Sequence, residues 1–370
     1  MRVGFLPALG GGLRELASTG QAARLIEGYF RPYAAAFDGL SYFSYLPERL
    51  EEFTSDPALL ASVRVLGPPH PTSRGWRAAT IPWTHAADVR SCRALRVFQI
   101  TGVIPALQAR ARFGIPYVTT YGFWYGTLSR GGARGLAKRV VTRLGLRCAA
   151  AVIVTTDALA AHVRHATRRV ELIPNGVATA VFRPPPGHRL RACPRQILYV
   201  GRLSEEKNLS TVIAATALVA KRVPVRLVLV GGGPLEARLR QEARAAAVDA
   251  EFRGVLDQRA LPGVYAEADA FVLASFTEGH PKVLLEALSA GLPCVASDCD
   301  GNRSLVEDGA TGLLFDPRRA DELAECLGRV LTDDALAARL STAGRALIVR
   351  QYDLGGTVAR EIELVREIAR

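Results

Sequence analysis

Short apolar runs alternate with longer segments of helical periodicity along the second half of the chain. The runs that read as buried strands are ILYV (197–200), VRLVLV (225–230), DAFVLAS (269–275), PCVAS (293–297) and TGLLF (311–315). Helical segments are expected between them from about Glu206, from Leu235 and over 281–290. Short strands separated by helices form parallel β-α-β units. The pattern therefore predicts a doubly wound α/β sheet whose strand-to-helix loops lie at one edge, where such folds bind ligands.

The first half shows the same alternation less regularly. Its predicted strands are RVGFL (2–6), RVFQI (96–100), PYVTTY (116–121) and AVIVT (151–155). Gly10, Gly11 and Gly12 follow the first of these strands and predict a flexible turn before a helix. This half is therefore expected to form a second sheet of the same kind.

A proline-rich segment separates the two halves. Residues 174–187 are rich in turn formers and contain three consecutive prolines, which is typical of an interdomain linker. A chain of 370 residues also exceeds the size at which a single core stops growing. We expect two Rossmann-like domains, 1–175 and 176–350, and a helix over 351–370 that packs back on the first of them.

The excess of positive charge is confined to the first half. Residues 1–187 contain 23 basic and 10 acidic residues, whereas the remainder contains 24 and 25. The asymmetry indicates two functionally distinct halves, one of which meets an anionic partner. No nucleic-acid recognition motif accompanies the charge, so no nucleic-acid partner is expected. Scattered cysteines, no signal peptide and no spanning apolar run predict a cytoplasmic protein with reduced thiols.

The strongest candidate site is the segment EGHPKVLLE at 278–286, which follows a predicted strand. Gly279 and Pro281 predict a tight turn, and proline suits the first position of a helix because its missing N–H has no partner there. The backbone N–H groups that follow are donors at a positive helix end, which binds anions. Glu278 and Glu286 can accept hydrogen bonds from neutral hydroxyls. The combination suits a sugar–diphosphate–nucleoside, although two glutamates on a solvated helix start would give the same pattern.

A second candidate segment, VGRLSEEKN at 200–208, follows the first strand of the second half. Gly201 allows a close backbone approach, while Arg202 and Lys207 offer a bidentate donor and a point charge to a diphosphate. Taken alone, these two cations would indicate a solvated loop. Because both segments lie on the same sheet edge, we expect them to form one site. A nicotinamide-dependent dehydrogenase fits poorly, since Glu236 stands where the glycine fingerprint needs a small residue.

The second half resembles the carboxyl-terminal domain of retaining GT-B glycosyltransferases of the group 1, or family four, class. The matching segments are VGRLSEEKN, LVLVGGGP, TEGHPKVLLEALSAGLPCVASD, GNRSLVEDGATGLLF with the following Asp316, IPNGV at 173–177, and the glycines near the amino terminus. The likeness covers about residues 173–335, and the first half matches only by layout. It implies a GT-B fold, with two Rossmann-like domains facing a central cleft, and a retaining hexosyltransferase that uses a nucleotide sugar.

The resemblance also implies a role for individual residues. In this class, the positions of Arg202 and Lys207 bind the donor diphosphate, Glu278 contacts the transferred sugar, and Glu286 contacts the ribose. Further donor contacts, mostly through the backbone, are implied for Gly11, Gly12, Gly201, Gly254, Val255, Gly279, His280, Lys282, Val283 and Leu284. Such transfers need no metal, and no D-x-D motif precedes the second half. No cofactor is therefore expected, and the donor substrate is a UDP- or GDP-sugar.

The first half departs from the class at a position that often holds a histidine. Here the run after Pro116 places Tyr121 in the matching position, and a tyrosine hydroxyl can still donate a hydrogen bond to a sugar. The aromatic residues that follow, Phe123, Trp124 and Tyr125, are candidates for stacking on an acceptor sugar. Packing between the domains is the alternative explanation for them.

A basic stretch in the first half suggests contact with an anionic membrane. Residues 130–147 contain six basic residues and no acidic residue. On a helix, Leu136, Val140 and Leu144 share one face, and Arg139, Arg143 and Arg147 line another. Membrane-associated members of the class use such a helix near a lipid-linked acceptor, whereas an arginine-rich solvated face is the alternative. The expected acceptor is a glycan or a lipid-linked intermediate; an inactive carbohydrate-binding scaffold and a sugar-nucleotide epimerase are the competing functions.

Overall fold

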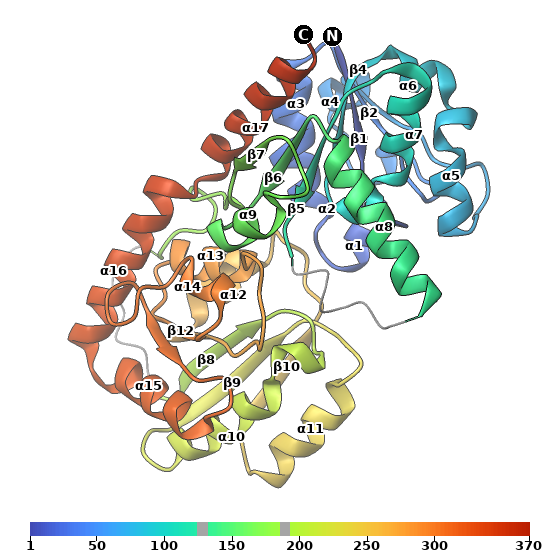
Figure 1. Ribbon diagram of the computed structural model, residues 1–370. Coiled ribbons are helices and arrows are strands. Elements are labelled where there is room, and N and C mark those ends of the chain that lie inside the picture. The colour runs from blue at the N-terminus through green and yellow to red at the C-terminus, as the bar shows by residue number, and fades with distance from the viewer. Residues whose placement is uncertain (124–131, 186–192) are drawn as a thin grey trace. The chain divides into compact units, whose positions relative to one another are not determined.

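The computed structural model describes residues 1–123, 132–185 and 193–370, and the chain divides into two units (Figure 1). Unit 1 comprises Met1–Pro174 and Gly355–Arg370, and unit 2 comprises Asn175–Leu354. The sequence placed the second boundary at 350, a few residues too early. Val177 and Asp353 pair as a parallel bridge, and this pairing keeps residues 351–354 in unit 2.

Unit 1 contains a seven-stranded parallel sheet in the order β3-β2-β1-β4-β5-β6-β7. The strands are β1 (Arg2–Leu6), β2 (Gly39–Tyr42), β3 (Val63–Val65), β4 (Cys92–Val97), β5 (Tyr117–Tyr121), β6 (Ala151–Val154) and β7 (Val170–Leu172). The strand expected over 96–100 was wrong, because β4 starts at Cys92 and a 3₁₀ helix starts at Ile100. Arg96, the first residue of the predicted run, lies buried near the end of β4 beside Glu361, so most of the strand precedes this charge.

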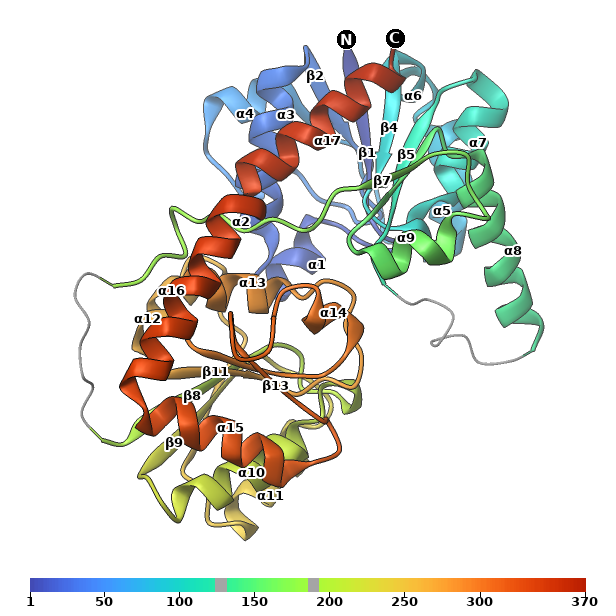
Figure 2. The ribbon, with the colours of Figure 1, turned by 60° about the vertical axis from the view of Figure 1, so that its left-hand side comes forward.

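Helices cover the sheet of unit 1, and the last of them comes from the far end of the chain (Figure 2). They are α1 (Leu13–Ser18), α2 (Ala22–Leu25), α3 (Arg31–Ala36), α4 (Pro57–Ser62), α5 (Arg74–Thr84), α6 (Ala86–Ser91), α7 (Ile104–Phe113), α8 (Ala133–Cys148), α9 (Asp157–Val163) and α17 (Leu354–Ile368). Helix α17 is fixed to unit 1 by Glu361, which accepts from Arg96 of β4 and Tyr33 of α3.

Unit 2 contains a six-stranded parallel sheet in the order β10-β9-β8-β11-β12-β13. The strands are β8 (Arg195–Val200), β9 (Val225–Val230), β10 (Ala250–Gly254), β11 (Ala270–Leu273), β12 (Cys294–Ser297) and β13 (Leu313–Phe315). The helices are α10 (Leu209–Ala220), α11 (Glu236–Ala245), α12 (Leu261–Glu267), α13 (Lys282–Ser289), α14 (Asp300–Arg303), α15 (Ala320–Thr332) and α16 (Asp334–Gln351). The two sheets confirm the predicted α/β class.

The strand order of unit 2 reverses between β8 and β11. From β8 the chain runs outward to β9 and β10, and from β11 it runs outward in the opposite direction to β12 and β13. Loops that follow the two central strands diverge at such a point and leave room for a ligand at the carboxyl edge of the sheet. Both segments that the sequence singled out, 200–208 and 278–286, begin in these two loops.

Candidate functional site

The loops after β8 and β11 meet in an ion pair between Lys207 and Glu278. Nζ of Lys207 lies 2.6 Å from Oε1 of Glu278, and the hydroxyl of Ser275 donates to the same oxygen at 2.6 Å. Glu278 is 8% exposed, and within the described ranges no hydrogen bond reaches its Oε2. An ammonium has three donors, of which this pair uses one. Both partners therefore keep hydrogen-bonding capacity toward a ligand.

Residues from β12 and α14 contact the loop that carries Glu278 and hold its backbone in place. The Ser297 hydroxyl donates to the Ser275 carbonyl at 2.6 Å, and Nδ2 of the buried Asn302 donates to both the carbonyl and the hydroxyl oxygen of Ser297. A Cβ on Gly301 would lie 2.6 Å from the carbonyl carbon and oxygen of Glu278, so this close approach requires glycine. Sequence reasoning missed these positions as supports of the site. Their signal was the placement of small polar residues directly after strands at the ligand-binding edge.

Glu286 occupies a separate position in α13 and is 2% exposed. Its Oε1 accepts a hydrogen bond from Nε2 of Gln258 at 2.9 Å, and its Oε2 accepts one from the hydroxyl of Tyr265 at 3.0 Å. Gln258 comes from the loop after β10, the strand that ends at Gly254. Two neutral donors thus help to orient the carboxylate of Glu286, and Gln258 connects it to the loop where the resemblance places the nucleobase. Sequence reasoning did not single out either donor.

The loops after β8, β9 and β10 stack on one another through their backbones. Gly201 N donates to Val230 O, Leu203 N donates to Gly232 O, and Gly231 N donates to Gly254 O. A Cβ on Gly231 would lie 1.9 Å from the Gly201 carbonyl oxygen, and one on Gly233 would lie 2.2 Å from that of Leu203. This packing thus requires glycine at Gly231 and Gly233 of the run after β9. The contacts between the loops explain why glycine stands at these positions, and no role in binding a dinucleotide is needed to account for them.

The remaining predicted residues of unit 2 lie around this edge. Arg202 is exposed, and its guanidinium has no hydrogen bond or ion pair within the part of the chain that the structure describes. Val255 is half exposed and follows Gly254, whose φ of +66° favours glycine. Helix α13 begins at Lys282 behind Pro281, without a side-chain cap and without an acidic residue in its first turn. The donor roles of these residues and of Gly279, Val283 and Leu284 stay predictions.

His280 is a buried neutral histidine in the Glu278 loop. It is 5% exposed, and burial lowers its pKa to about 3. Its backbone carbonyl accepts a hydrogen bond from Nδ2 of Asn175 at 2.7 Å. Its ring lies against Tyr352, with the centroids 5.4 Å apart. The side chain of His280 therefore faces the interior of unit 2, and a contact to the donor would come from its backbone.

The glycine turn of unit 1 has a carboxylate at the start of α1. Backbone N–H groups of Leu13 and Arg14 donate to the two oxygens of Glu48 at 2.8 Å each. A Cβ on Gly12 would lie 2.8 Å from Oε1 of Glu48, so glycine is needed beside this carboxylate. The first N–H groups of α1 therefore already have an anionic partner. Donor contacts from Gly11 and Gly12 stay a prediction, and they would use other atoms of the turn.

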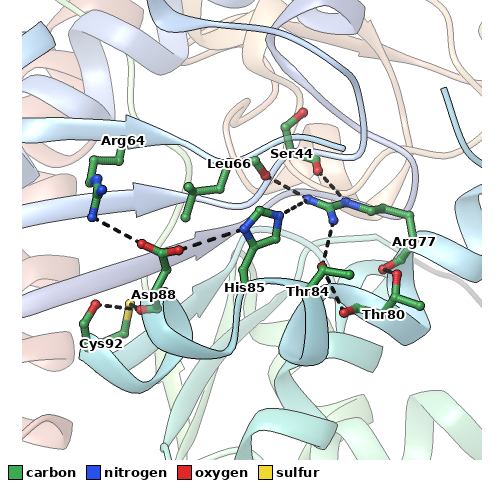
Figure 3. A network of polar contacts seen from close by, with 10 residues as sticks. Ser44, Arg64, Leu66, Arg77, Thr80, Thr84, His85, Asp88 and Cys92 are labelled. Atoms are coloured by element: carbon green, nitrogen blue, oxygen red, sulfur yellow. Dashed lines mark hydrogen bonds and ion pairs between the residues drawn. The ribbon is translucent and has the colours of Figure 1, made fainter. Parts of the chain in front are cut away.

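A buried guanidinium fixes the loops around this turn (Figure 3). Arg77 of α5 donates to the carbonyls of Ser44 and Leu66, which follow β2 and β3, and its Nη2 lies 3.1 Å from Nε2 of His85. Burial lowers the pKa of Arg77, and burial together with Arg77 lowers that of His85. The Ser44 hydroxyl donates in turn to Glu48. Arg77 thus holds in place the carboxylate that caps α1.

The aromatic and basic candidates of unit 1 are only partly described. Tyr121 ends β5, is 3% exposed and stacks on His162 with ring centroids 5.8 Å apart. Phe123 is half-buried, whereas Trp124 and Tyr125 lie outside the described residues. Helix α8 contains the predicted apolar stripe, and its members are largely exposed at 62%, 50% and 48% for Leu136, Val140 and Leu144. Across the described ranges, no helix combines the length and the apolar character that a membrane crossing requires.

Comparison with known protein families matches both halves of the chain. Residues 186–347 match the family model "Glycosyl transferases group 1", and residues 46–181 match "Glycosyltransferase Family 4". The chain belongs to the group 1 glycosyltransferases of the GT-B kind. In this family member, the strand order reverses between β8 and β11, and Lys207 pairs with Glu278 at that point.

Curated relatives of this group 1 chain align with about half of it. A GDP-mannose-dependent alpha-(1-6)-phosphatidylinositol monomannoside mannosyltransferase of Mycobacterium tuberculosis is 31% identical over 214 residues, which are 53% of this chain and 56% of the relative. The glycogen synthase of the same organism is 35% identical over 187 residues, which are 50% of this chain and 45% of the relative. The chain thus spans about half the length of the curated relatives that it matches.

Solved structures share the GT-B fold over the whole chain. A sucrose-phosphate synthase from Thermosynechococcus elongatus has a TM-score of 0.81 and 22% identity, covering 100% of this chain and 99% of that structure. Anabaena HepE in complex with UDP and glucose has a TM-score of 0.78 and 20% identity, covering 99% and 100%. These likenesses confirm the predicted architecture of two Rossmann-like domains.

Proposed function

We propose that this chain is a retaining hexosyltransferase that moves a sugar from a UDP- or GDP-sugar to a hydroxyl of a glycan or of a lipid-linked acceptor. The observation that carries the proposal is the Lys207–Glu278 pair at the point where the strand order of unit 2 reverses. A cation that is already oriented beside a carboxylate suits a substrate with phosphate next to sugar hydroxyls. Family membership supports the same assignment.

In this proposal, different residues of unit 2 bind different parts of the donor. Arg202, Lys207 and the start of α13 neutralise the diphosphate, and Glu278 holds the hydroxyls of the transferred sugar through its free oxygen. Glu286 holds the ribose, and the backbone at 254–255 borders the nucleobase. Two similar proteins support a nucleotide-sugar donor. The mannosyltransferase relative is named as GDP-mannose-dependent, and the HepE structure was solved with UDP and glucose.

The proposed reaction breaks the bond between the anomeric carbon and the phosphate oxygen through an oxocarbenium-like state. The acceptor oxygen forms the new bond from the same face, and its proton passes to the departing phosphate. Fixed positive groups around the phosphate stabilise the charge that develops there, so no metal ion is required. Glu278 then acts by positioning and electrostatics rather than as a nucleophile.

A screen of nucleotides followed by a transfer assay tests the proposal. UDP, GDP and their sugar conjugates are added to the protein, and the conjugate that most raises the unfolding temperature is used as donor, with a chelator present. We expect nucleotide release and glycosylation of an added acceptor. Conversion of the donor to another nucleotide sugar without acceptor would indicate an epimerase. No stabilisation by any nucleotide sugar would contradict the proposal.

We also propose that helix α8 holds the protein against an anionic membrane, at the cytoplasmic face, where a lipid-linked acceptor would lie. Leu136, Val140 and Leu144 are exposed, and exposed arginines lie beside them on the same helix. Burial of such a stripe between lipid headgroups combines apolar contact with charge attraction. We expect sedimentation with anionic but not neutral vesicles, and weaker sedimentation after Leu136→Ser and Val140→Ser. Equal recovery with both vesicle types would contradict this part.

A further inference from the structure

Two segments that are distant in the sequence form one backbone pair in unit 2. The chain enters unit 2 at Asn175 and leaves it after Leu354. Val177 N donates to Tyr352 O at 2.9 Å, and Leu354 N donates to Val177 O at 2.8 Å. We call the segments 175–179 and 352–354 the paired connectors. Their hydrogen bonds make the two passages of the chain a single structural element.

Each of the paired connectors also contacts His280. Nδ2 of Asn175, on the first connector, donates to the His280 carbonyl at 2.7 Å. The ring of Tyr352, on the second, lies on the His280 ring at a tilt of 48°. His280 is almost wholly buried and stands two residues after Glu278. Both connectors therefore converge on the loop that carries the carboxylate of the site.

We infer that Asn175 and Tyr352 are positioning residues, which set the place of Glu278 by holding His280. The inference rests on the proposed function of Glu278. The loop that carries Glu278 runs between β11 and α13 without regular structure, so its path depends on contacts at both ends. Ser275 is held by Ser297 at the first end, and His280 is held by the paired connectors at the second. Because a displacement of about 1 Å can cost on the order of 100-fold in rate, these contacts matter for turnover.

Tyr352 supports the loop from a second direction. Its hydroxyl donates to the Ser304 carbonyl at 3.3 Å, directly after α14. Gly301 of α14 packs on the backbone of Glu278. In the His280 ring, Nδ1 is buried and has no hydrogen-bond partner among the residues that the structure describes. The ring therefore serves by its shape and packing, which is what a positioning contact requires.

Matched variants of the connectors separate positioning from general loosening. Asn175→Ala removes the bond to His280, and Tyr352→Leu removes the ring contact, whereas Tyr352→Phe keeps the ring. Thr179→Val is the control, because Thr179 donates to Asp353 at 2.5 Å within the paired connectors without touching His280. The measurements are kcat and donor KM with the best donor of the screen, and hydrogen exchange of backbone amides in 276–281.

We expect Asn175→Ala and Tyr352→Leu to lower kcat by about 10- to 100-fold, with a donor KM that changes by less than about threefold. Amide exchange in 276–281 should speed up in both variants. Thr179→Val should stay close to the wild type in both readouts, whereas Tyr352→Phe, which keeps the ring and loses only the hydroxyl bond to Ser304, should show a smaller change than Tyr352→Leu. If Tyr352→Leu does not fold, Asn175→Ala decides alone.

Two outcomes overturn the inference, and a third concerns the proposed function only. Unchanged exchange in 276–281 overturns the positioning role whether or not the protein is active. An equal loss of kcat in Thr179→Val overturns it as well, because that residue does not reach His280. No turnover by the wild type with any nucleotide sugar, together with faster exchange in the variants, would instead refute the proposed function and leave the connector contact established.

Discussion

Two buried glutamates, Glu361 in unit 1 and Glu278 in unit 2, form ion pairs that differ in how completely the carboxylate is hydrogen-bonded. Glu361 is 4% exposed and accepts from Nε and Nη2 of Arg96 at 2.8 Å each and from the Tyr33 hydroxyl at 2.8 Å. Arg96 completes its own set with the Val97 carbonyl and the Thr120 hydroxyl. In unit 2, both bonds to the Glu278 carboxylate go to a single oxygen.

The difference shows which buried charge stabilises the fold and which one is available for a ligand. A buried pair is tolerated when the hydrogen-bonding groups of both partners are satisfied, as in the pair of Arg96 and Glu361. A buried carboxylate with one unused oxygen costs stability, and proteins keep such groups where function requires them. Burial alone therefore does not distinguish Glu278 from Glu361, whereas the unused Oε2 of Glu278 marks this carboxylate as available to a ligand.

The largest effect should come from removal of Glu361. Glu361→Ala leaves Arg96 buried and unpaired, which costs about 3–5 kcal/mol of unfolding free energy. Urea unfolding measures the change. The matched control is Glu367→Ala on the same helix, because Glu367 pairs with Arg169 at the surface and should change stability far less. Equal destabilisation by both variants would show that the buried pair has no special weight.

Removal of charge at Glu278 should act on turnover instead. We expect Glu278→Gln and Lys207→Ala each to lower kcat at least about 100-fold, or about 2.7 kcal/mol, through loss of one preorganised contact. Steady-state kinetics with the identified donor gives the value. Glu205→Gln serves as the control, since Glu205 is exposed in the same loop and pairs with Arg238. Near-normal turnover of both site variants would show that the pair of Lys207 and Glu278 does not take part in the reaction.

His280 makes the stability of unit 2 depend on pH. Its pKa of about 3 lies below its ordinary value of 6.5, so the unfolded chain takes up a proton that the folded chain refuses. Well above pH 6.5 the ring is neutral in both states, and the free energy of unfolding is unaffected. As the pH falls from 6.5 toward 3, only the unfolded state binds the proton, so the free energy of unfolding decreases. Between pH 7 and pH 5, wild type should lose about 2 kcal/mol more than His280→Phe in urea unfolding. Parallel losses in the two proteins would contradict the buried neutral ring.

The smallest effect is expected for the neutral donors of Glu286. Gln258→Ala removes one hydrogen bond to this carboxylate, which is worth about 1 kcal/mol. We therefore expect the donor KM to rise about fivefold with little change in kcat. Titration calorimetry with the free nucleotide checks the same change in affinity. A fall in kcat without a change in KM would assign Gln258 to the reaction rather than to the nucleoside.

The sequence predicted central strands better than edge strands. The run 225–230 coincides with β9, because a strand buried on both faces is almost continuously apolar. Strand β10 was missed, since it lies at the edge of the sheet and all of its residues are half-buried, with Glu251 and Arg253 among them. Strand β4 was displaced because Arg96 interrupts its apolar pattern. The partner of Arg96 is distant in the sequence, whereas Arg253 of β10 pairs with the nearby Glu251 and Glu267. What the two errors share is a charged residue inside the strand.

The sequence by itself determined the parallel α/β architecture and the placement of Lys207 and Glu278 at one sheet edge, because periodicity and loop position are local properties. Only the tertiary structure decided which groups pair. Glu361 meets Arg96 across 265 residues, Asn175 meets His280 across 105, and Glu48 meets Leu13 across 35. Such contacts follow from the packing of distant elements, and a buried charge leaves no trace of its partner in the sequence around it.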